Sequence, residues 1–305
     1  MDAEELHVAQ AARWRAVDPL LPAPGPPQAE PLTVVDGAGW VRRTVLDPAG
    51  VSATWTALHN HVLTAHVAGP DPAAALGALI DRWEQLGFGP PDDPESVAEV
   101  VWPSRDVAPV LALARHGFAP AVAVAVGRPG RAVAPDVPGL EVRPVETDAD
   151  VAVAAAFGLE IVRYDAQFGA LGERPSTAAQ LAESFTAAAR REVPTTWLAV
   201  LDGQPVGMCA IDPPGYAAGA GALCSESAVG YLGSMYVDPS VRSAGIGSVL
   251  HAHGDAALKA AGAEVTLLHH AVPNPRSTPF WYRQGYRPLW THWQRRPAVR
   301  HPGGA

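Results

Sequence analysis

The fold is decided by one stretch of sequence, MYVDPSVRSAGIGS at residues 235–248. It begins as an apolar strand, crosses a short loop and enters an amphipathic helix. Gly245 and Gly247 leave the first helical turn without side chains, so a ligand can approach the backbone closely. The first N–H groups of a helix have no partner within it, and the helix dipole favours negative charge there. Together with the cationic side chain of Arg242, this pattern predicts a site for a phosphate or pyrophosphate.

Two common nucleotide-binding patterns do not fit this stretch. The dinucleotide pattern Gly-x-Gly-x-x-Gly requires a third glycine at position 250, where the chain has Leu250. The triphosphate loop requires Gly-Lys-Ser/Thr, which is missing. The position of the stretch between an apolar strand and an amphipathic helix is therefore its informative property.

This arrangement resembles the GCN5-related N-acetyltransferase (GNAT) superfamily, in which Gln/Arg-x-x-Gly-x-Gly/Ala joins a strand to a helix. The matching residues run from Arg242 to Gly247. The family's next motif is a strand, an asparagine and a short aromatic helix that ends in Gly-aromatic. It is matched by Asn274 and by the segment that ends at Gly285-Tyr286. The resemblance covers residues 140–294 and implies an α/β fold with a mixed central β-sheet flanked by helices.

The resemblance also implies a co-substrate, acetyl-CoA. In the family, the loop holds the pyrophosphate and the preceding strand pairs with the pantetheine arm. The residues expected to contact the cofactor are therefore Met235, Tyr236, Val237, Arg242, Ser243, Ala244, Gly245, Ile246, Gly247, Ser248, Asn274 and Ser277.

We predict Tyr282 as the general acid, although it lies one position after the place where the resemblance would put this residue. The family usually places a tyrosine four residues before the glycine, where this chain has Trp281. A shift of one helical residue turns a side chain by about 100°. Five residues stay open as the general base, namely Glu160, Asp165, Glu226, His269 and His270.

The chain also contains an internal repeat. Residues 64–80 fall on 234–250 with a shift of 170, and residues 116–120 resemble 284–288. We therefore predict two tandem GNAT-like domains, a degenerate one at 1–127 and a catalytic one at 139–305. They are joined by a Pro- and Gly-rich linker at 128–138. The first half is expected to be degenerate because Pro72 and Ala75 stand where the second half has Arg242 and Gly245.

The secondary structure follows from apolar periodicity and from Gly and Pro breaks. In the first half we expect helices at 3–17, 73–86 and 107–116, and strands at 40–46, 51–67 and 118–126. In the second half we expect helices at 177–191, 245–261 and 278–284, and another that begins after Thr147. The strands there are expected at 140–145, 196–201, 206–211, 231–237, 264–270 and 286–294, with a loop at 213–228.

Composition excludes several other classes. The 305 residues have a net charge of −9 and no basic cluster, which argues against nucleic acid and anionic lipid as partners. The acidic start does not resemble a signal peptide, and no apolar run approaches the ~20 residues that span a membrane. Two cysteines cannot form a disulfide framework. We therefore expect a cytoplasmic protein, and no metal, because the histidine spacing matches no known ligand set.

The sequence thus predicts an acetyl-CoA-dependent N-acetyltransferase, which moves an acetyl group to an amine by direct attack on the thioester. The acceptor is left open between a small molecule, an amino acid and a protein N-terminus. A mycothiol synthase-like acetyltransferase and a non-catalytic acyl-CoA-binding protein are alternatives. A homodimer is one option for the oligomeric state.

Overall fold

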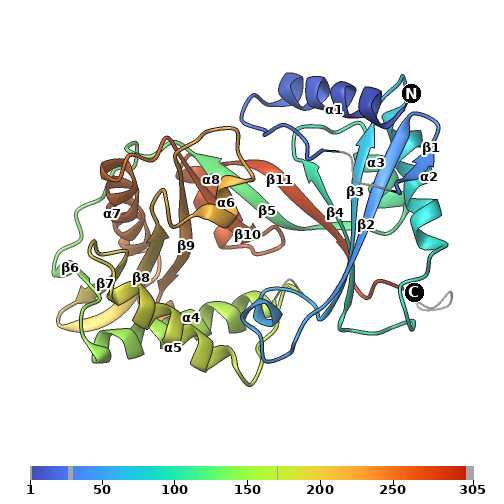
Figure 1. The fold of residues 1–305 in the computed structure, drawn as a ribbon. Helices are drawn as coiled ribbons and strands as arrows, with labels where there is room; N and C mark the ends of the chain where they lie inside the picture. The colour runs from blue at the N-terminus through green and yellow to red at the C-terminus, as the bar shows by residue number, and fades with distance from the viewer. Residues whose placement is uncertain (1, 27–29, 170, 300–305) are drawn as a thin grey trace. The chain divides into compact units, whose positions relative to one another are not determined.

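The computed structural model describes residues 2–26, 30–169 and 171–299 (Figure 1). The chain divides into two compact units. The first contains the chain up to Val124, the segment Ala271–Pro273 and the segment from Pro288 onward, and the second contains Ala125–His270 and Asn274–Arg287. The expected linker thus counts with the second unit, and most of the last strand counts with the first. The division into domains at 1–127 and 139–305 refers to the sequence repeat rather than to these units, and it stays a prediction.

The repeat predicted from the sequence is present in the secondary structure. Strands β3 (His59–Val67) and β9 (Val229–Val237) have equal lengths and begin 170 positions apart. Strands β5 (Ala119–Gly127) and β11 (Arg287–Arg295) also have equal lengths and begin 168 positions apart. These are the two offsets found in the sequence, so from β3 and from β9 onward the two halves follow the same succession of strands and α-helices.

The first unit contains a mixed sheet with the strand order β1-β2-β3-β4-β11. Strand β3 is antiparallel to β2 and parallel to β4, and β11 is antiparallel to β4. The remaining bounds are β1 (Leu32–Val34), β2 (Gly37–Val45), β4 (Ser96–Pro103), α1 (Ala3–Val17), α2 (Pro72–Glu84) and α3 (Val110–Arg115). The strand that ends the second repeat therefore pairs with a strand of the first repeat.

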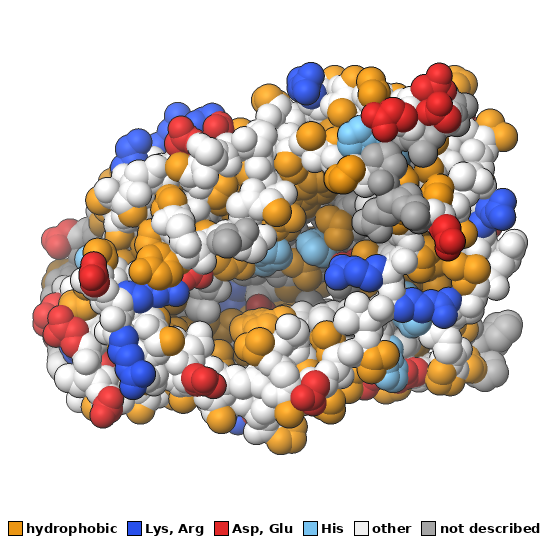
Figure 2. Space-filling view, viewed as in Figure 1, with side chains coloured by type: hydrophobic (Ala, Val, Ile, Leu, Met, Phe, Trp, Pro, Cys, Tyr) orange, Lys and Arg blue, Asp and Glu red, His pale blue; other side chains and the backbone are white. Residues whose placement is uncertain are grey.

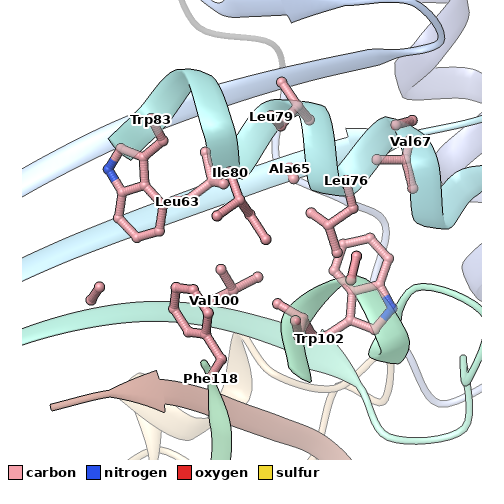
Figure 3. Close-up of a cluster of buried hydrophobic side chains, with 14 of the residues drawn as sticks. Leu63, Ala65, Val67, Leu76, Leu79, Ile80, Trp83, Val100, Trp102 and Phe118 are labelled. Atoms are coloured by element: carbon pink, nitrogen blue, oxygen red, sulfur yellow. The ribbon is translucent and has the colours of Figure 1, made fainter. Parts of the chain in front are cut away.

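The core of this unit lies between the sheet and α2 (Figure 3). Leu76, Leu79, Ile80 and Trp83 recur at helical spacing, and all four are fully buried. They pack on alternate residues of β3, represented in Figure 3 by Leu63, Ala65 and Val67. The opposite face of the strands packs against α1, through Ala38, Trp40 and Leu6.

The second unit contains a sheet with the order β10-β9-β8-β7-β6. Its bounds are β6 (Leu140–Pro144), β7 (Thr196–Leu201), β8 (Gln204–Asp212) and β10 (Val265–Ala271). Helices α4 (Asp148–Ala166) and α5 (Thr177–Ala189) cover one face, and α7 (Ile246–Ala260) covers the other (Figure 1). The predicted hairpin is confirmed, because Asp202 and Gly203 both have positive φ, 50° and 81°, as a type I′ turn requires.

Three sequence expectations in the first half and in the loop region need correction. The strand expected at 51–67 begins only at His59, and Val51–Thr54 forms a 3-10 turn. Strand β4 was not predicted, because it is buried along most of its length and lacks the alternation that marks a half-exposed strand. The loop expected at 213–228 contains the short helix α6 (Ala218–Gly221).

The surface in view carries acidic and basic side chains interspersed with apolar ones (Figure 2). Within the described residues, no helix is both long enough and apolar enough to cross a bilayer.

Candidate functional site

The loop between β9 and α7 has the geometry that its sequence predicts. Gly245 is the N-cap of α7 and has a φ of 90°, a conformation that L side chains rarely adopt. The N–H groups of Ser248 and Val249 both bond the carbonyl of Gly245, at 2.9 and 3.1 Å. No side chain among the described residues caps this helix. The N–H groups of Ile246 and Gly247, which precede these two residues, are therefore available to an anion.

The two glycines of this loop have different tasks. A Cβ on Gly245 would lie 3.1 Å from Cγ of Pro135, in addition to requiring the left-handed backbone conformation. A Cβ on Gly247 would lie 3.3 Å from the ring of Phe280 on α8 (Ser277–Arg283). Gly245 therefore sets the direction of the backbone, whereas Gly247 allows two helices to pack closely.

Strands β9 and β10 separate in front of this loop. They pair in parallel only from Val229 to Tyr231, so for the rest of its length β9 pairs with no described strand on that side. The register with β8 shifts beside Gly233, which inserts a bulge into β9. Beyond the bulge, the N–H of Asp238 donates to the carbonyl oxygen of Val206 on β8, so the N–H of Val237 points to the opposite edge, where β10 has diverged. A free strand edge thus leads to the start of α7.

Arg242 closes the loop and provides a positive charge beside it. Its Nε donates to the carbonyl oxygen of Val237 at 2.9 Å, and its guanidinium lies 5.9 Å from the ring of Tyr164. Arg276 lies 6.0 Å from the same ring, and its Nε donates to the Tyr164 hydroxyl at 3.1 Å. Two guanidinium groups therefore stand at this end of β9, and the sequence pattern identified only the first.

Asn274 organises the start of α8. Its side-chain oxygen accepts the backbone N–H groups of Arg276 and Ser277 at 2.9 and 3.1 Å, and its amide nitrogen donates to Asp165 at 2.7 Å. Burial raises the pKa of Asp165, and the bond from Asn274 partly offsets this rise. The hydroxyl of Ser277 is buried, and no described residue bonds it. One amide hydrogen of Asn274 and this hydroxyl are thus left for a ligand.

The other expected cofactor residues lie along the same path. Met235 and Tyr236 are half-buried on β9, and Tyr236 stacks on Phe157 of α4 with ring centroids 4.7 Å apart. Ser243 and Ala244 are exposed in the loop, whereas Ile246 is buried beneath it. The hydroxyl of Ser248 accepts a hydrogen bond from Gln284 at 3.2 Å.

The structure separates the two aromatic residues considered for acid catalysis. Trp281, at the position where the family has tyrosine, is buried in the core beside His251 and Tyr286. Tyr282 is 42% exposed, and partial burial raises the pKa of its hydroxyl. Only Tyr282 can reach solvent-borne reactants, which is consistent with the choice made from the sequence but does not test its role.

Two of the carboxylates considered as general bases form ion pairs. Glu160 bonds Arg163 at 3.0 Å on the exposed side of α4. Glu226 lies 3.8 Å from Arg128. Each pairing favours a structural role for its carboxylate.

The two histidines differ in burial. His270 is buried, and its Nδ1 lies 3.1 Å from the hydroxyl of Thr278. His269 is exposed at the point where β10 leaves β9, with its Nδ1 3.0 Å from the hydroxyl of Tyr231. Burial raises the pKa of Tyr231 to about 12, so this hydroxyl stays protonated at neutral pH.

In the first repeat, backbone N–H groups around the equivalent loop form hydrogen bonds with side chains of the chain. The carboxylate of Asp71 caps α2 by accepting the N–H of Ala74 at 2.9 Å. Strand β3 pairs with β4 only from His59 to Val62, so its edge is also left open by the sheet. There the N–H of Val67, which corresponds to Val237, donates to the side chain of Gln10 on α1 at 2.8 Å. Gln10 is fully buried.

Sequence reasoning missed several features of the site. The bulge could have been inferred from Gly233, since a glycine inside a strand pattern often marks one. The bond between Asp165 and Asn274 joins residues 109 positions apart, and no local signal announces it. Among the described residues, no group of three or more His, Cys, Asp or Glu could hold a metal ion.

Comparison with known proteins finds a family model that is similar to part of this chain. Residues 163–286 match the model of the acetyltransferase (GNAT) family. A GCN5-related N-acetyltransferase from Sphaerobacter thermophilus is similar in structure, with a TM-score of 0.51 and 16% identity over 87% of this chain and 79% of the other. At that identity the likeness shows the fold alone.

Two further solved structures resemble this chain. A GCN5-related N-acetyltransferase from Kribbella flavida has a TM-score of 0.46 and 17% identity, over 98% of this chain and 96% of the other. A tandem GNAT protein from the clavulanic acid biosynthesis pathway has a TM-score of 0.45 and 14% identity, over 96% and 94%. A search of curated proteins finds no match.

Proposed function

We propose, from the premise that this chain carries an acetyltransferase domain of the GNAT family at residues 163–286, that it is an acetyl-CoA-dependent N-acetyltransferase with one working cofactor site. The site is formed by the second repeat, at the edge of β9, the loop to α7 and the start of α8. The acceptor is an amine.

The observation that carries this proposal is the open edge of β9 leading to an uncapped helix. Gly245 leaves the first N–H groups of α7 available, and Arg242 adds a positive charge there. The N–H of Val237 points into the gap left by β10, and the buried hydroxyl of Ser277 has no bond from a described residue. A ligand with a pyrophosphate at one end and amide groups along its length fits these partners, and acetyl-CoA has both.

In the reaction, acetyl-CoA supplies an acetyl thioester. An alkyl ammonium acceptor has a pKa of ~10.4, so it must lose a proton before it can attack. A carboxylate or histidine at the site takes this proton, directly or through water. Of the residues considered, His269 combines exposure with a place at the divergence of the two strands.

The N–H of Val237 acts on the thioester oxygen, and the hydroxyl of Tyr282 acts on the leaving sulfur. The N–H of Val237 donates to the thioester oxygen, on which negative charge develops during attack. The hydroxyl of Tyr282 donates a proton to the departing thiolate. Since a thiol has a pKa near ~8.5, by analogy with cysteine, this protonation lowers the barrier only modestly.

The first repeat is proposed to be a degenerate domain that does not bind acetyl-CoA. At the start of α2 the Asp71 carboxylate already accepts the N–H of Ala74, and a carboxylate there would repel a phosphate. At the edge of β3 the Gln10 side chain bonds the N–H of Val67, the equivalent of Val237. Pro72 stands where the second repeat has Arg242, so the first repeat has neither a backbone N–H nor a positive charge at this position.

The finer details stay predictions. The acceptor is open between a small molecule, an amino acid and a protein N-terminus. A mycothiol synthase-like acetyltransferase and a non-catalytic acyl-CoA-binding protein remain the alternative functions. The cytoplasmic location and the homodimer also stay predictions.

The test is a calorimetric titration of the protein with acetyl-CoA. We expect one site per chain, abolished in the double variant Arg242→Ala, Gly245→Val. Two sites would overturn the degenerate first repeat, and no binding would overturn the proposed function. Free-thiol release in the presence of an amine panel that includes a cysteinyl amine then identifies the acceptor class. Binding without thiol release across the panel would favour the non-catalytic alternative.

A further inference from the structure

The segment that the sequence marks as a linker is fastened to α7 by one buried carboxylate. Asp255 lies in the middle of α7 and is 4% exposed. Its Oδ2 accepts the backbone N–H groups of three successive residues, Gly130, Arg131 and Ala132, at 2.8, 3.1 and 3.1 Å. Hydrogen bonds to an ionised carboxylate are stronger than neutral ones. This set is therefore a strong local anchor.

From this anchor the segment extends along α7 to the cofactor loop. Gly130 packs against the side chain of Lys259 in the last turn of the helix, where a Cβ would lie 3.2 Å from Cγ of that lysine. At the other end, a Cβ on Gly245 would lie 3.1 Å from Cγ of Pro135 and 3.3 Å from Cγ2 of Val137. We refer to residues 130–137 as the strap.

The strap lies against Gly245, the residue whose conformation sets the direction of the cofactor loop. Gly245 has few intrinsic restraints on its φ, because glycine populates many conformations. Pro135 and Val137 lie where a side chain of Gly245 would be, and so restrict the alternatives, while Val137 also packs against the core beneath α7. Apart from these packing contacts, the strap is largely exposed between its two ends, so it depends on Asp255 for its path.

We propose that Asp255 is a positioning residue for the cofactor loop. By fixing the strap along α7, it keeps Gly245 in the left-handed conformation that directs the first N–H groups of the helix toward the pyrophosphate. The effect on cofactor binding rests on the function proposed above. The effect on the conformation of the loop does not.

The test compares Asp255→Ala with Asp150→Ala. Asp150 is a second multiply bonded carboxylate of the same unit, which accepts from Arg143 and Thr147 at the start of α4. Both variants are expected to lower the melting temperature. Asp255→Asn, which has the same shape without the charge, serves as a milder variant should Asp255→Ala fail to fold.

The first measurement is amide hydrogen exchange without ligand. We expect Asp255→Ala, and to a smaller degree Asp255→Asn, to accelerate exchange at residues 130–132 and also at Ser248 and Val249, whose N–H groups bond Gly245. Asp150→Ala should leave all five unchanged. Faster exchange at 130–132 alone would overturn the proposal, because the strap would then be released without any effect on the loop.

The second measurement is the dissociation constant for acetyl-CoA. If release of the strap leaves about a tenth of the molecules with a competent loop, the constant rises about tenfold in Asp255→Ala. It should not change in Asp150→Ala. An unchanged constant in both would overturn the positioning role. If the wild-type protein binds no acetyl-CoA, the proposed function fails, and hydrogen exchange still decides whether the strap orders the loop.

Discussion

Replacing Gly245 by alanine should weaken the binding of acetyl-CoA with little loss of folding. An L residue held in the left-handed conformation is less stable by ~1–2 kcal/mol. The new Cβ would also press on Pro135 at 3.1 Å, so the loop of the free protein should relax to another conformation. Binding must then restore the strained conformation. Since ~1.4 kcal/mol corresponds to a tenfold change, the dissociation constant should rise about 5- to 30-fold.

The matched control lies at the other end of the same helix. Gly262 has a φ of 83°, follows the last residue of α7 by two positions, and its Cβ would meet no atom within 4 Å. Gly262→Ala therefore introduces the same backbone strain far from the loop, and it should lower the melting temperature without changing the dissociation constant. Calorimetric titration and thermal unfolding of both variants provide the two readouts. Equal dissociation constants for Gly245→Ala, Gly262→Ala and the wild type would refute the assignment of the cofactor loop.

Three further predictions follow from individual contacts. Gln10→Leu removes the acceptor for the buried N–H of Val67, so the free energy of unfolding measured in urea should fall by ~1–3 kcal/mol. A second acetyl-CoA site in that variant would contradict the proposal that the first repeat is degenerate. Burial, and to a lesser degree His7, lower the pKa of His66 from 6.5 to about 4. Between these pH values the unfolded chain binds a proton that the folded chain does not, so the melting temperature should fall as the pH drops from 6.5 to 4. An equally steep fall in His66→Phe would contradict this. Tyr282→Phe should lower kcat by about three- to tenfold, because a thiolate leaves readily without a proton, and should leave the dissociation constant for acetyl-CoA unchanged. An unchanged kcat would remove Tyr282 from the mechanism.

Local patterns predicted most of the elements. The helix at 3–17, the hairpin around Asp202-Gly203 and the loop at 235–248 all depend on signals within a few residues, such as caps, turn residues and periodicity. The internal repeat was equally visible, because equivalent strands and helices keep their apolar spacing at a constant offset. Strand β4 escaped because burial on both faces removes the alternation that identifies a strand.

The roles of individual side chains required the tertiary structure. Asn274 looked free for a ligand in the sequence, and the fold gives two of its bonds to the backbone of α8 and one to Asp165. Trp281 and Tyr282 are neighbours in the sequence, and only packing places the first in the core and leaves the second exposed. Such outcomes depend on which distant residue occupies the neighbouring space.

The sequence by itself therefore determined that a strand, a glycine-containing loop and a helix follow one another at 235–248, since turns, caps and helical periodicity are properties of neighbouring residues. Only the tertiary structure decided that the N–H of Val67 on β3 is bonded by a side chain, whereas the N–H of Val237 faces the edge that β10 leaves. Gln10 reaches Val67 across 57 positions of sequence, and Asp255 holds the strap from 123 to 125 positions away. Contacts of this kind form because packing brings distant side chains and backbone groups together, and a buried N–H must then be satisfied by whatever polar group lies beside it.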